Sequence, residues 1–328
     1  MKNIAVVGCG HWGKNLVRNF AELGSLFAIC DPNTNIADIF SKKYNIQNLS
    51  FEEILNNPNI TGVVLAIPAP LHASFAINGM NAGKHIFVEK PIAMNTNEAN
   101  QMIEASKKNN VYLMVGHLLQ YHPVFIKTLD LVKAGNIGDI NYIYSNRLSL
   151  GKVRSQEDVI WSFAPHDISM LLALANNEEV DTVFTESKSI IQKDISDTSI
   201  IHLNFMNGLK AHIFVSWLHP YKEHKLVVIG TKGIIVFDDT KPWKEKLVRH
   251  NHTIQQSEDI IEINQTNHQF IDVIESEPLR DECVHFMDVV NNNIKPLTSG
   301  DEGLKVLNIL AAASKSICDK KTIKINEL

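Results

Sequence analysis

The sequence lacks the features that mark several protein classes. Its four cysteines form no CxxC pair, which argues against a thiolate zinc site and a disulfide framework. No apolar run approaches the ~20 residues of a membrane span, and no signal-peptide pattern is present. No Lys/Arg-rich run offsets the net charge of -5, which disfavours nucleic acid as a partner. We therefore expect a cytoplasmic protein with reduced cysteines, no metal site, and no nucleic-acid or membrane partner.

The composition is that of an ordinary globular chain. A length of 328 residues favours two domains. The apolar content of 45% and the charged content of 20% provide material for two hydrophobic cores. No internal repeat or low-complexity segment is visible.

The N-terminal region has the order strand, glycine turn, helix, strand, acidic residue. An apolar run at 4–7 leads into Gly8-Cys9-Gly10-His11-Trp12-Gly13, and a second run at 26–30 ends at Asp31. This order predicts a dinucleotide-binding βαβ unit. The glycines would allow a tight turn, close approach of a pyrophosphate and close helix packing, and the helix N-terminus would bind the phosphates. The alternative is a sharp strand-to-helix turn that binds no nucleotide.

Asp31 suggests which dinucleotide binds. Its carboxylate can accept hydrogen bonds from a ribose diol, whereas it would repel a 2′-phosphate by roughly 4 kcal/mol at about 4 Å and an effective dielectric near 20. That energy corresponds to about a thousandfold in affinity. We therefore expect NAD rather than NADP, unless a nearby cation compensates the phosphate.

Further short apolar runs continue the pattern, at 63–67, 85–88 and 111–115, with helix-like segments between them. Five buried strands alternating with helices predict an α/β fold with a doubly wound parallel sheet of the Rossmann type, which we assign to an NAD-binding domain at 1–120. Ligands of such sheets bind at the carboxyl ends of the strands, which brings Pro68 and Glu89 to the same edge as the glycine turn.

The pattern changes beyond residue 120. The runs that read as strands joined by short turns lie at 140–148, 198–206, 209–217, 225–229 and 234–237, with hairpin signals at 206–209 and 230–233. They predict an α+β domain at 121–328 with an open, mostly antiparallel sheet, for substrate binding and oligomerisation. The expected covering helices are 165–175 and 304–317. We assign no chemistry to residues 240–280.

Two residues are candidates for proton chemistry. Lys90, in Glu89-Lys90-Pro91, follows a core strand, where its ammonium could stabilise a developing alkoxide; a surface ion pair is the alternative. His166 follows Pro165, which suits a first helical turn, so His166 and Asp167 are expected at a helix N-terminus. There the neutral, proton-accepting form of histidine would be favoured.

Taken together, these motifs resemble the glucose-fructose oxidoreductase and inositol dehydrogenase family, Gfo/Idh/MocA. The resemblance spans nearly the whole chain and rests on the glycine turn, Asp31-Pro32, Ile67-Pro68 with His72, Glu89-Lys90-Pro91, Gly116-His117 before Tyr121-His122-Pro123, His166 and Gly230-Thr231-Lys232-Gly233. It implies a nicotinamide-binding domain followed by an α/β domain whose open sheet often forms an oligomer interface. It also implies hydride transfer at a sugar or cyclitol carbon, with Lys90 and His166 at the reacting hydroxyl.

Within the family, the second half looks closest to bacterial enzymes that oxidise C3 of UDP-N-acetylglucosamine. The residues that would contact cofactor are expected to be Gly8, Gly10, His11, Trp12, Gly13, Asp31, Pro68, His72, Glu89 and Lys90. Those that would contact substrate are expected to be Tyr121, His122, Arg147, Lys152, Arg154 and Asp167. The basic members of the second set would suit a diphosphate, although a solvated basic strand end fits the spacing equally well.

The chain departs from the family pattern around His166. Ser162 and Ser169 occupy positions where the family commonly has aspartates, so the carboxylate that would orient His166 is missing. Asp167 could substitute for it, or Lys90 could carry more of the proton transfer. We predict an NAD-dependent dehydrogenase of a nucleotide-linked sugar, acting at C3 of the sugar, that forms a homodimer or homotetramer. The alternatives are a dehydrogenase of a free sugar or inositol, and a non-catalytic NAD-binding regulatory protein.

Overall fold

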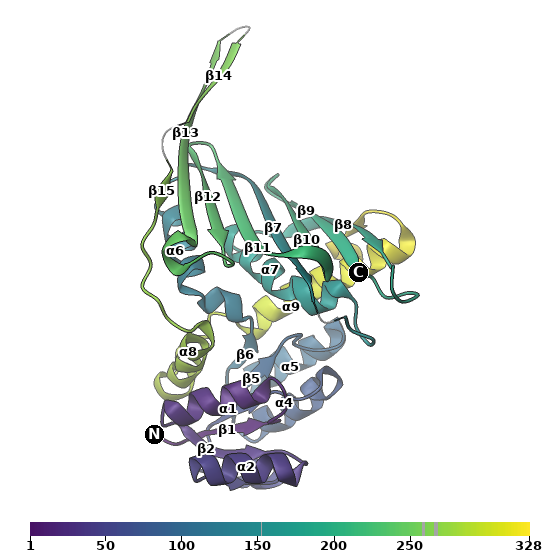
Figure 1. The fold of residues 1–328 in the computed structure, drawn as a ribbon. Coiled ribbons are helices and arrows are strands. Elements are labelled where there is room, and N and C mark those ends of the chain that lie inside the picture. The colour runs from purple at the N-terminus through teal and green to yellow at the C-terminus, as the bar shows by residue number, and fades with distance from the viewer. Residues whose placement is uncertain (152, 258–259, 266–267) are drawn as a thin grey trace. The chain divides into compact units, whose positions relative to one another are not determined.

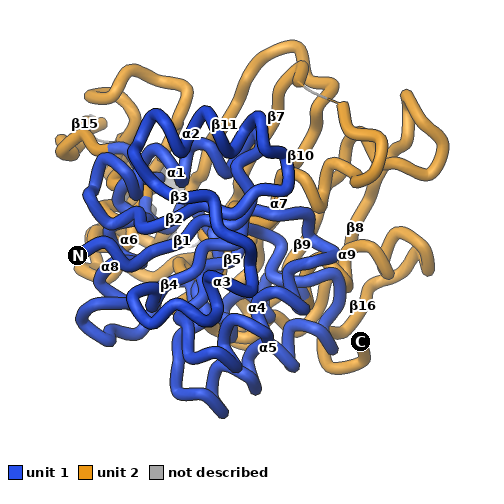
Figure 2. The backbone as a smooth tube through the Cα atoms, turned by 90° about the horizontal axis from the view of Figure 1, so that it is seen from below, with its two compact units in different colours: residues 1–121, 277–307 blue, residues 122–276, 308–328 orange. Residues whose placement is uncertain are grey.

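The computed structural model describes residues 1–328 except 152, 258–259 and 266–267. The chain forms two compact units, and neither is one continuous stretch (Figures 1 and 2). Unit 1 contains 1–121 and 277–307, and unit 2 contains 122–276 and 308–328. Residues 277–307, which the sequence analysis placed in the second domain, therefore pack with the first. Figure 2 shows them in the colour of unit 1.

Unit 1 is built on a parallel sheet. Its six described strands have the order β3-β2-β1-β4-β5-β6 and pair in parallel throughout. The strands are β1 (Ile4–Val7), β2 (Leu26–Cys30), β3 (Gln47–Asn48), β4 (Gly62–Leu65), β5 (His85–Glu89) and β6 (Leu113–Gly116). The predicted Rossmann-type sheet is confirmed, with β3 as an edge strand that the apolar pattern had not indicated. The order reverses between β1 and β4, which is where doubly wound sheets bind ligands.

Helices cover both faces of this sheet. They are α1 (Gly13–Glu22), α2 (Thr34–Tyr44), α3 (Phe51–Asn56), α4 (His72–Asn81), α5 (Thr96–Asn109), α8 (Pro278–Asn292) and the first part of α9 (Gly300–Asp319), with short 3-10 turns η1 (Ala69–Leu71) and η2 (Leu118–Tyr121). α8 packs beside α1, where Phe286 meets Phe20 and Phe87 edge-to-face at centroid distances of 6.3 and 5.6 Å. This aromatic contact explains why residues 277–307 belong to unit 1: the apolar face of α8 is buried against β5 and α1.

Unit 2 is built on an open sheet. Its ten described strands pair antiparallel except for β7 with β10. They are β7 (Ile140–Leu150), β8 (Val180–Lys188), β9 (Thr198–Phe205), β10 (Lys210–Ser216), β11 (Leu218–Gly230), β12 (Gly233–Asp238), β13 (Leu247–Ser257), β14 (Ile260–Gln265), β15 (Gln269–Phe270) and β16 (Ile323–Lys324). The mostly antiparallel sheet and both hairpin turns are confirmed. β13 and β14, in the stretch left without an assignment, pair as a hairpin at the end of the sheet (Figure 1).

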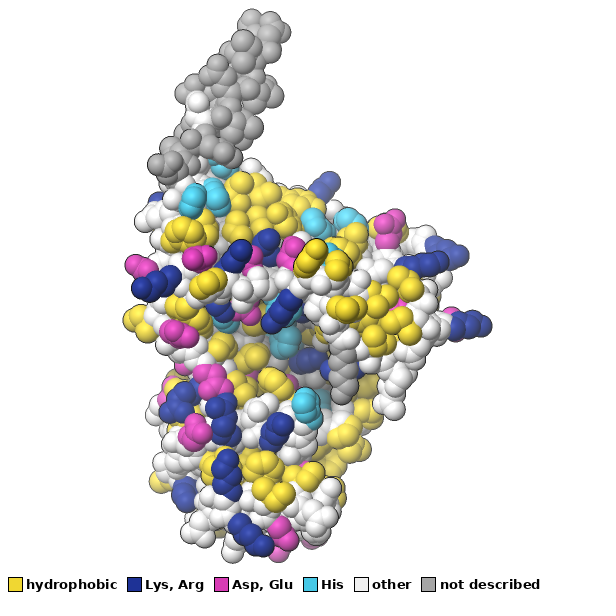
Figure 3. All heavy atoms as spheres, in the orientation of Figure 1, with side chains coloured by type: hydrophobic (Ala, Val, Ile, Leu, Met, Phe, Trp, Pro, Cys, Tyr) yellow, Lys and Arg dark blue, Asp and Glu magenta, His cyan; other side chains and the backbone are white. Residues whose placement is uncertain are grey.

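One face of this sheet is covered and the other is open. The helix that packs on β7, β9 and β10 is α7 (Val159–Leu174). The unit also contains α6 (Pro123–Lys133), the part of α9 from residue 308 onward, η3 (Trp243–Glu245) and η4 (Ile325–Glu327). On the other face, aromatic rings and histidines contact each other across strands, as in Tyr144 stacked on His212 at 5.3 Å. In Figure 3, hydrophobic side chains and histidines gather over the strands of unit 2.

The expected helix at 165–175 begins earlier than predicted. α7 starts at Val159, with the Asp158 carboxylate accepting a hydrogen bond from the Trp161 amide at 3.0 Å, and Pro165 lies inside the helix. His166 is therefore in the interior of α7, and the argument that a helix N-terminus favours its neutral form is wrong. Proline prefers the first turn but is not confined to it, and the true start signal was the N-cap Asp158.

Candidate active site

The glycine turn after β1 contains two glycines that the packing requires and one with open space beside it. Gly8 has a φ of +90°, and an added Cβ would lie 2.4 Å from the carbonyl oxygen of Ala66. A Cβ on Gly13 would lie 2.0 Å from the Gly8 carbonyl oxygen, whereas a Cβ on Gly10 meets no described atom within 4 Å. The fold therefore needs Gly8 and Gly13. The space beside Gly10 is open among the described residues and is compatible with the close approach of a ligand.

The N-terminus of α1 is suited to an anion. Trp12 occupies the N-cap position without a side-chain hydrogen bond to the helix, and the first turn contains no acidic residue within the described chain. The first amides of a helix carry partial positive charge, and here those of Lys14 and Asn15 also donate to the carbonyl oxygens of Gly10 and Trp12 at 3.2 and 2.9 Å. His11 and Trp12 are exposed beside them. An open turn and an uncapped helix N-terminus fit the pyrophosphate of a dinucleotide.

Asp31 extends from the end of β2 toward the same turn. Its Oδ2 accepts a hydrogen bond from the Cys9 amide at 2.6 Å, and its Oδ1 accepts one from the Asn33 amide at 2.9 Å. These two bonds hold the carboxylate in place and leave further lone pairs for hydroxyl donors. Among the described residues, no lysine or arginine forms an ion pair with Asp31.

The Glu89-Lys90-Pro91 turn lies at the end of β5, at the carboxyl edge of the sheet. Glu89 Oε1 accepts a hydrogen bond from Trp12 Nε1 at 2.5 Å, and Oε2 accepts one from the Lys90 amide at 3.3 Å. Burial raises the pKa of Glu89, and the Trp12 hydrogen bond and the Lys90 charge oppose that rise. The turn that holds half-buried Lys90 is thus tied directly to the glycine turn.

His72 contacts the backbone of this turn. Its Nδ1 lies 2.8 Å from the Pro91 carbonyl oxygen and its Nε2 lies 2.9 Å from the Ile67 carbonyl oxygen, with 1% of the residue exposed. Burial lowers the pKa of His72, and a neutral imidazole can donate to only one of the two carbonyls at a time. His72 therefore joins the ends of β4 and β5 and has no surface for the expected cofactor contact. Pro68, next to Ile67, is exposed at the same edge.

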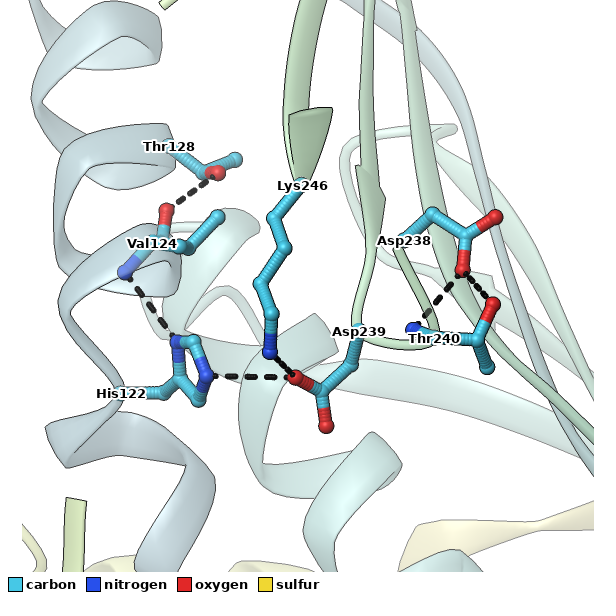
Figure 4. A network of polar contacts seen from close by, with 7 residues as sticks. All are labelled: His122, Val124, Thr128, Asp238, Asp239, Thr240 and Lys246. Carbon is cyan, nitrogen blue, oxygen red and sulfur yellow. Dashed lines mark hydrogen bonds and ion pairs between the residues drawn. The ribbon is translucent and has the colours of Figure 1, made fainter. Parts of the chain in front are cut away.

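Tyr121 and His122 are buried rather than available to a ligand. Tyr121 is 4% exposed, and its hydroxyl lies 2.9 Å from Thr298 Oγ1. His122 caps α6: its Nδ1 accepts from the Val124 amide at 3.1 Å, which leaves Nε2 as the donor, 3.4 Å from Asp239 Oδ1 (Figure 4). The structure therefore does not support the expected substrate contacts.

The half-buried Asp239 carboxylate is the centre of a second network. Lys246 also donates a hydrogen bond to Asp239 (Figure 4). Its ammonium group lies over the Trp243 ring, 5.1 Å from the centroid. Although burial alone raises the pKa of Asp239, the hydrogen bonds from His122 and Lys246 hold it well below its usual range. This network ties α6 to the turn after β12.

Asp167 and Arg147 form a hydrogen-bonded ion pair. Arg147 donates to both Asp167 oxygens, from Nε at 2.6 Å and from Nη2 at 3.1 Å, and Ser145 Oγ donates to Oδ1 at 2.6 Å. Asp167 is 1% exposed. The expectation that Asp167 replaces the missing aspartate beside His166 therefore has no geometric support, because all of its described partners lie on β7. Arg147, likewise, already pairs with a carboxylate through its Nε and Nη2 edge.

The remaining candidate residues are Arg154, Lys152 and His166. Arg154 has a side chain that is 46% exposed and lies 3.6 Å from Glu157 Oε1, so it stays accessible. Lys152 lies outside the described residues. His166 is half-buried in α7, with Ser162 and Ser169 buried on the same helix.

Sequence reasoning missed two titratable residues. His224 faces Arg147 across the β7–β11 pair, and burial together with the Arg147 charge lowers its pKa to about 4. Glu282 lies on the apolar face of α8 and is 1% exposed. A glutamate among Leu279, Cys283 and Phe286 was the available signal, because that helical spacing otherwise defines a core face.

The strand order, the glycine turn at the switch point and the open helix N-terminus define unit 1 as a dinucleotide-binding domain of the Rossmann type. Residues 2–117 match the model of an oxidoreductase family with an NAD-binding Rossmann fold, and residues 125–236 match the model of the GFO/IDH/MocA C-terminal domain. The chain belongs to the Gfo/Idh/MocA oxidoreductase family.

Two similar proteins, one of them with a solved structure, illustrate the range within the family. A myo-inositol 2-dehydrogenase from Thermotoga maritima is 25% identical, covering 99% of each chain. A UDP-N-acetylglucosamine 3-dehydrogenase from Acidithiobacillus ferrooxidans is 26% identical over 64% of this chain and 66% of its own. A crystal form of that last enzyme has the same fold, with a TM-score of 0.83, 20% identity, and coverage of 96% of this chain and 97% of its own. Within the described chain, no helix combines the length and apolar character needed to cross a bilayer.

Proposed function

We propose that the protein is an NAD-dependent dehydrogenase that oxidises a secondary hydroxyl on a sugar or cyclitol ring to a ketone. The observation that carries this proposal is the link between two loops of unit 1: the Trp12 indole of the glycine turn donates to Glu89, which also holds the Lys90 amide. The glycine turn would bind the dinucleotide, and the neighbouring turn would present an ammonium group to the substrate. Bound NAD supplies the hydride acceptor.

The proposed roles divide between binding and proton transfer. The open turn at Gly10, the amides of α1 and the Asp31 carboxylate would bind the dinucleotide, with Pro68, His11 and Trp12 at the same edge. The Lys90 ammonium would donate a hydrogen bond to the reacting oxygen. In the reducing direction it would supply a proton to that oxygen as the hydroxyl forms. His166 of unit 2 is the second proposed catalytic residue, as a proton acceptor. Holding a ring carbon in a reactive orientation supplies much of the rate in such reactions.

Asp31 should make the protein prefer NAD. We expect Asp31→Ser to reduce the ratio of NADP to NAD dissociation constants by about two to three orders of magnitude, because a carboxylate repels a 2′-phosphate by roughly 4 kcal/mol. Calorimetric titration with both dinucleotides measures this ratio. Asp38→Ser, which removes the same charge from the exposed face of α2, is the matched control and should leave the ratio unchanged. An equal preference for both cofactors in the parent protein would contradict the assignment to NAD.

A nucleotide sugar such as UDP-N-acetylglucosamine, oxidised at C3, is the first candidate substrate. The 3-dehydrogenase relative supports it, as does Arg154, an accessible guanidinium in the segment that follows β7. Guanidinium groups bind phosphate oxygens in pairs, which suits a diphosphate.

A free sugar or inositol is the second candidate, and one specific observation favours it. Arg147, one of the expected diphosphate ligands, donates to Asp167 from Nε and Nη2, so one edge of its guanidinium is already paired with a carboxylate. The inositol dehydrogenase relative also matches along the full chain. A ring without a diphosphate would not need Arg147.

A single-turnover experiment separates these candidates. Protein with its cofactor oxidised is mixed with UDP-N-acetylglucosamine or with myo-inositol, and the absorbance of reduced nicotinamide is recorded. We expect a rise with at least one compound. A rise with the nucleotide sugar that UDP suppresses supports the first candidate, and a rise with inositol that UDP does not affect supports the second. No rise across a panel of sugars and polyols would instead favour a non-catalytic NAD-binding protein.

The homodimer or homotetramer stays a prediction. The uncovered face of the unit 2 sheet supports it, because Tyr142, Tyr144, His202 and His212 form a cluster of ring contacts there. An apolar and aromatic sheet face of this kind is suited to packing against a second copy.

A further inference from the structure

A carboxyl group is buried on the apolar face of α8. Glu282 is 1% exposed and shares this face with Leu279, Cys283, Phe286 and Val289. Neither of its oxygens has a hydrogen-bond partner among the described residues. An unpartnered polar group in a protein interior calls for an explanation, because its desolvation is not compensated.

The surroundings of Glu282 favour a neutral acid. An isolated carboxylate in an apolar interior is so unfavourable that the group takes up a proton instead. The titratable groups that face it are Glu89 at the end of β5, Tyr121 in η2 and Cys283 on its own helix. None of these is a cation. Burial, and then the charge of Glu89, raise the pKa of Glu282.

Glu89 receives the donors that Glu282 lacks. Trp12 Nε1 and the Lys90 amide both donate to Glu89 oxygens. Two interacting carboxyl groups do not both ionise readily, and the one with more donors holds the negative charge. The pair is therefore expected to carry one charge, on Glu89, and one proton, on Glu282.

We propose that Glu282 is a positioning residue, a buried neutral carboxylic acid behind Glu89 that lets Glu89 stay ionised in its contacts with Trp12 and the Lys90 turn. A second negative charge at Glu282 would repel the Glu89 carboxylate and loosen the turn that presents Lys90. The inference rests on the proposed function, in which Lys90 contacts the substrate. Its consequence is that high pH should disturb catalysis through α8, on which no proposed catalytic residue lies.

Glu282→Gln tests the proposal, because the amide has nearly the same shape and cannot ionise. We expect its kcat at neutral pH to remain within about threefold of the parent, and the fall of kcat at high pH to move upward by about one unit, with KM unchanged. Glu104→Gln, on the exposed face of α5, is the control and should keep the parent profile. Identical high-pH limbs in Glu282→Gln and the parent would overturn the proposal.

Two measurements without substrate keep this test separate from that of the proposed function. A group whose pKa is raised on folding stabilises the protein below its unfolded pKa, and this contribution is lost as pH rises toward the folded value. The melting temperature of the parent should therefore fall, relative to that of Glu282→Gln, as pH rises above the pKa of glutamate in the unfolded chain. Infrared difference spectra of the two proteins should also show the carbonyl band of a protonated carboxylic acid at neutral pH. Absence of that band would overturn the proposal even if no substrate is found, whereas its presence in a protein that oxidises nothing would reject only the proposed function.

Discussion

Lys90→Ala is expected to lower kcat by about a thousandfold and leave the dissociation constant of NAD within about threefold of the parent value. The reason is that the Lys90 side chain would act on the reacting oxygen, whereas the turn is held through the Lys90 amide, which alanine retains. Single-turnover rates with the best substrate and calorimetric titration with NAD measure the two quantities.

The control for this variant is another lysine of unit 1. Lys107, on α5, has a side chain that is 69% exposed and pairs with Asp301 at 3.4 Å. Lys107→Ala should change kcat by less than about twofold, because an exposed pair of this kind contributes little. If Lys90→Ala turned over within tenfold of the parent, Lys90 would be removed from the mechanism.

The glycine turn gives the second large effect, as a contrast between two alanine variants. Gly10→Ala should weaken NAD binding by about a hundredfold, close to 2.7 kcal/mol, and change the free energy of unfolding of the cofactor-free protein by less than about 1 kcal/mol. An added methyl group there meets no described protein atom within 4 Å, so only a bound ligand would be displaced.

Gly8→Ala should behave in the opposite way. Its methyl group would lie 2.4 Å from the Ala66 carbonyl oxygen, at a φ of +90° that alanine rarely adopts, so the cofactor-free protein should lose about 3 kcal/mol or more of stability. Chemical denaturation without cofactor measures both variants. Unchanged NAD affinity in Gly10→Ala would show that the dinucleotide binds elsewhere.

The local parts of the site were predictable because they are encoded in short segments. Gly8, Gly10 and Gly13 lie in one turn, and Asp31 and Lys90 each follow an apolar strand directly. A strand end in a parallel sheet fixes the edge on which the next residue lies, so their positions could be inferred without tertiary contacts. The same holds for the two hairpins of unit 2, whose turn residues specify the connection.

The candidates that the structure shows to be buried or already paired are those whose environment depends on distant segments. His72, Tyr121 and His122 have ligand-like side chains, but their partners are Pro91, Thr298 and Asp239, from 19 to 177 residues away. Arg147 was read as a phosphate ligand because nothing in its own strand shows that Asp167, on a helix, occupies its guanidinium. Burial and pairing of this kind have no local signature.

The sequence by itself determined the oxidoreductase family, the parallel sheet and the edge where the proposed chemistry lies, because glycine turns, strand periodicity and strand-end residues act over a few neighbours. Only the tertiary structure decided which polar side chains remain available for a ligand, and that α8 returns to unit 1 with a glutamate on its buried face. Those outcomes depend on which apolar faces meet, as in the contact of Phe286 with Phe87, and that choice is made by packing across the whole chain.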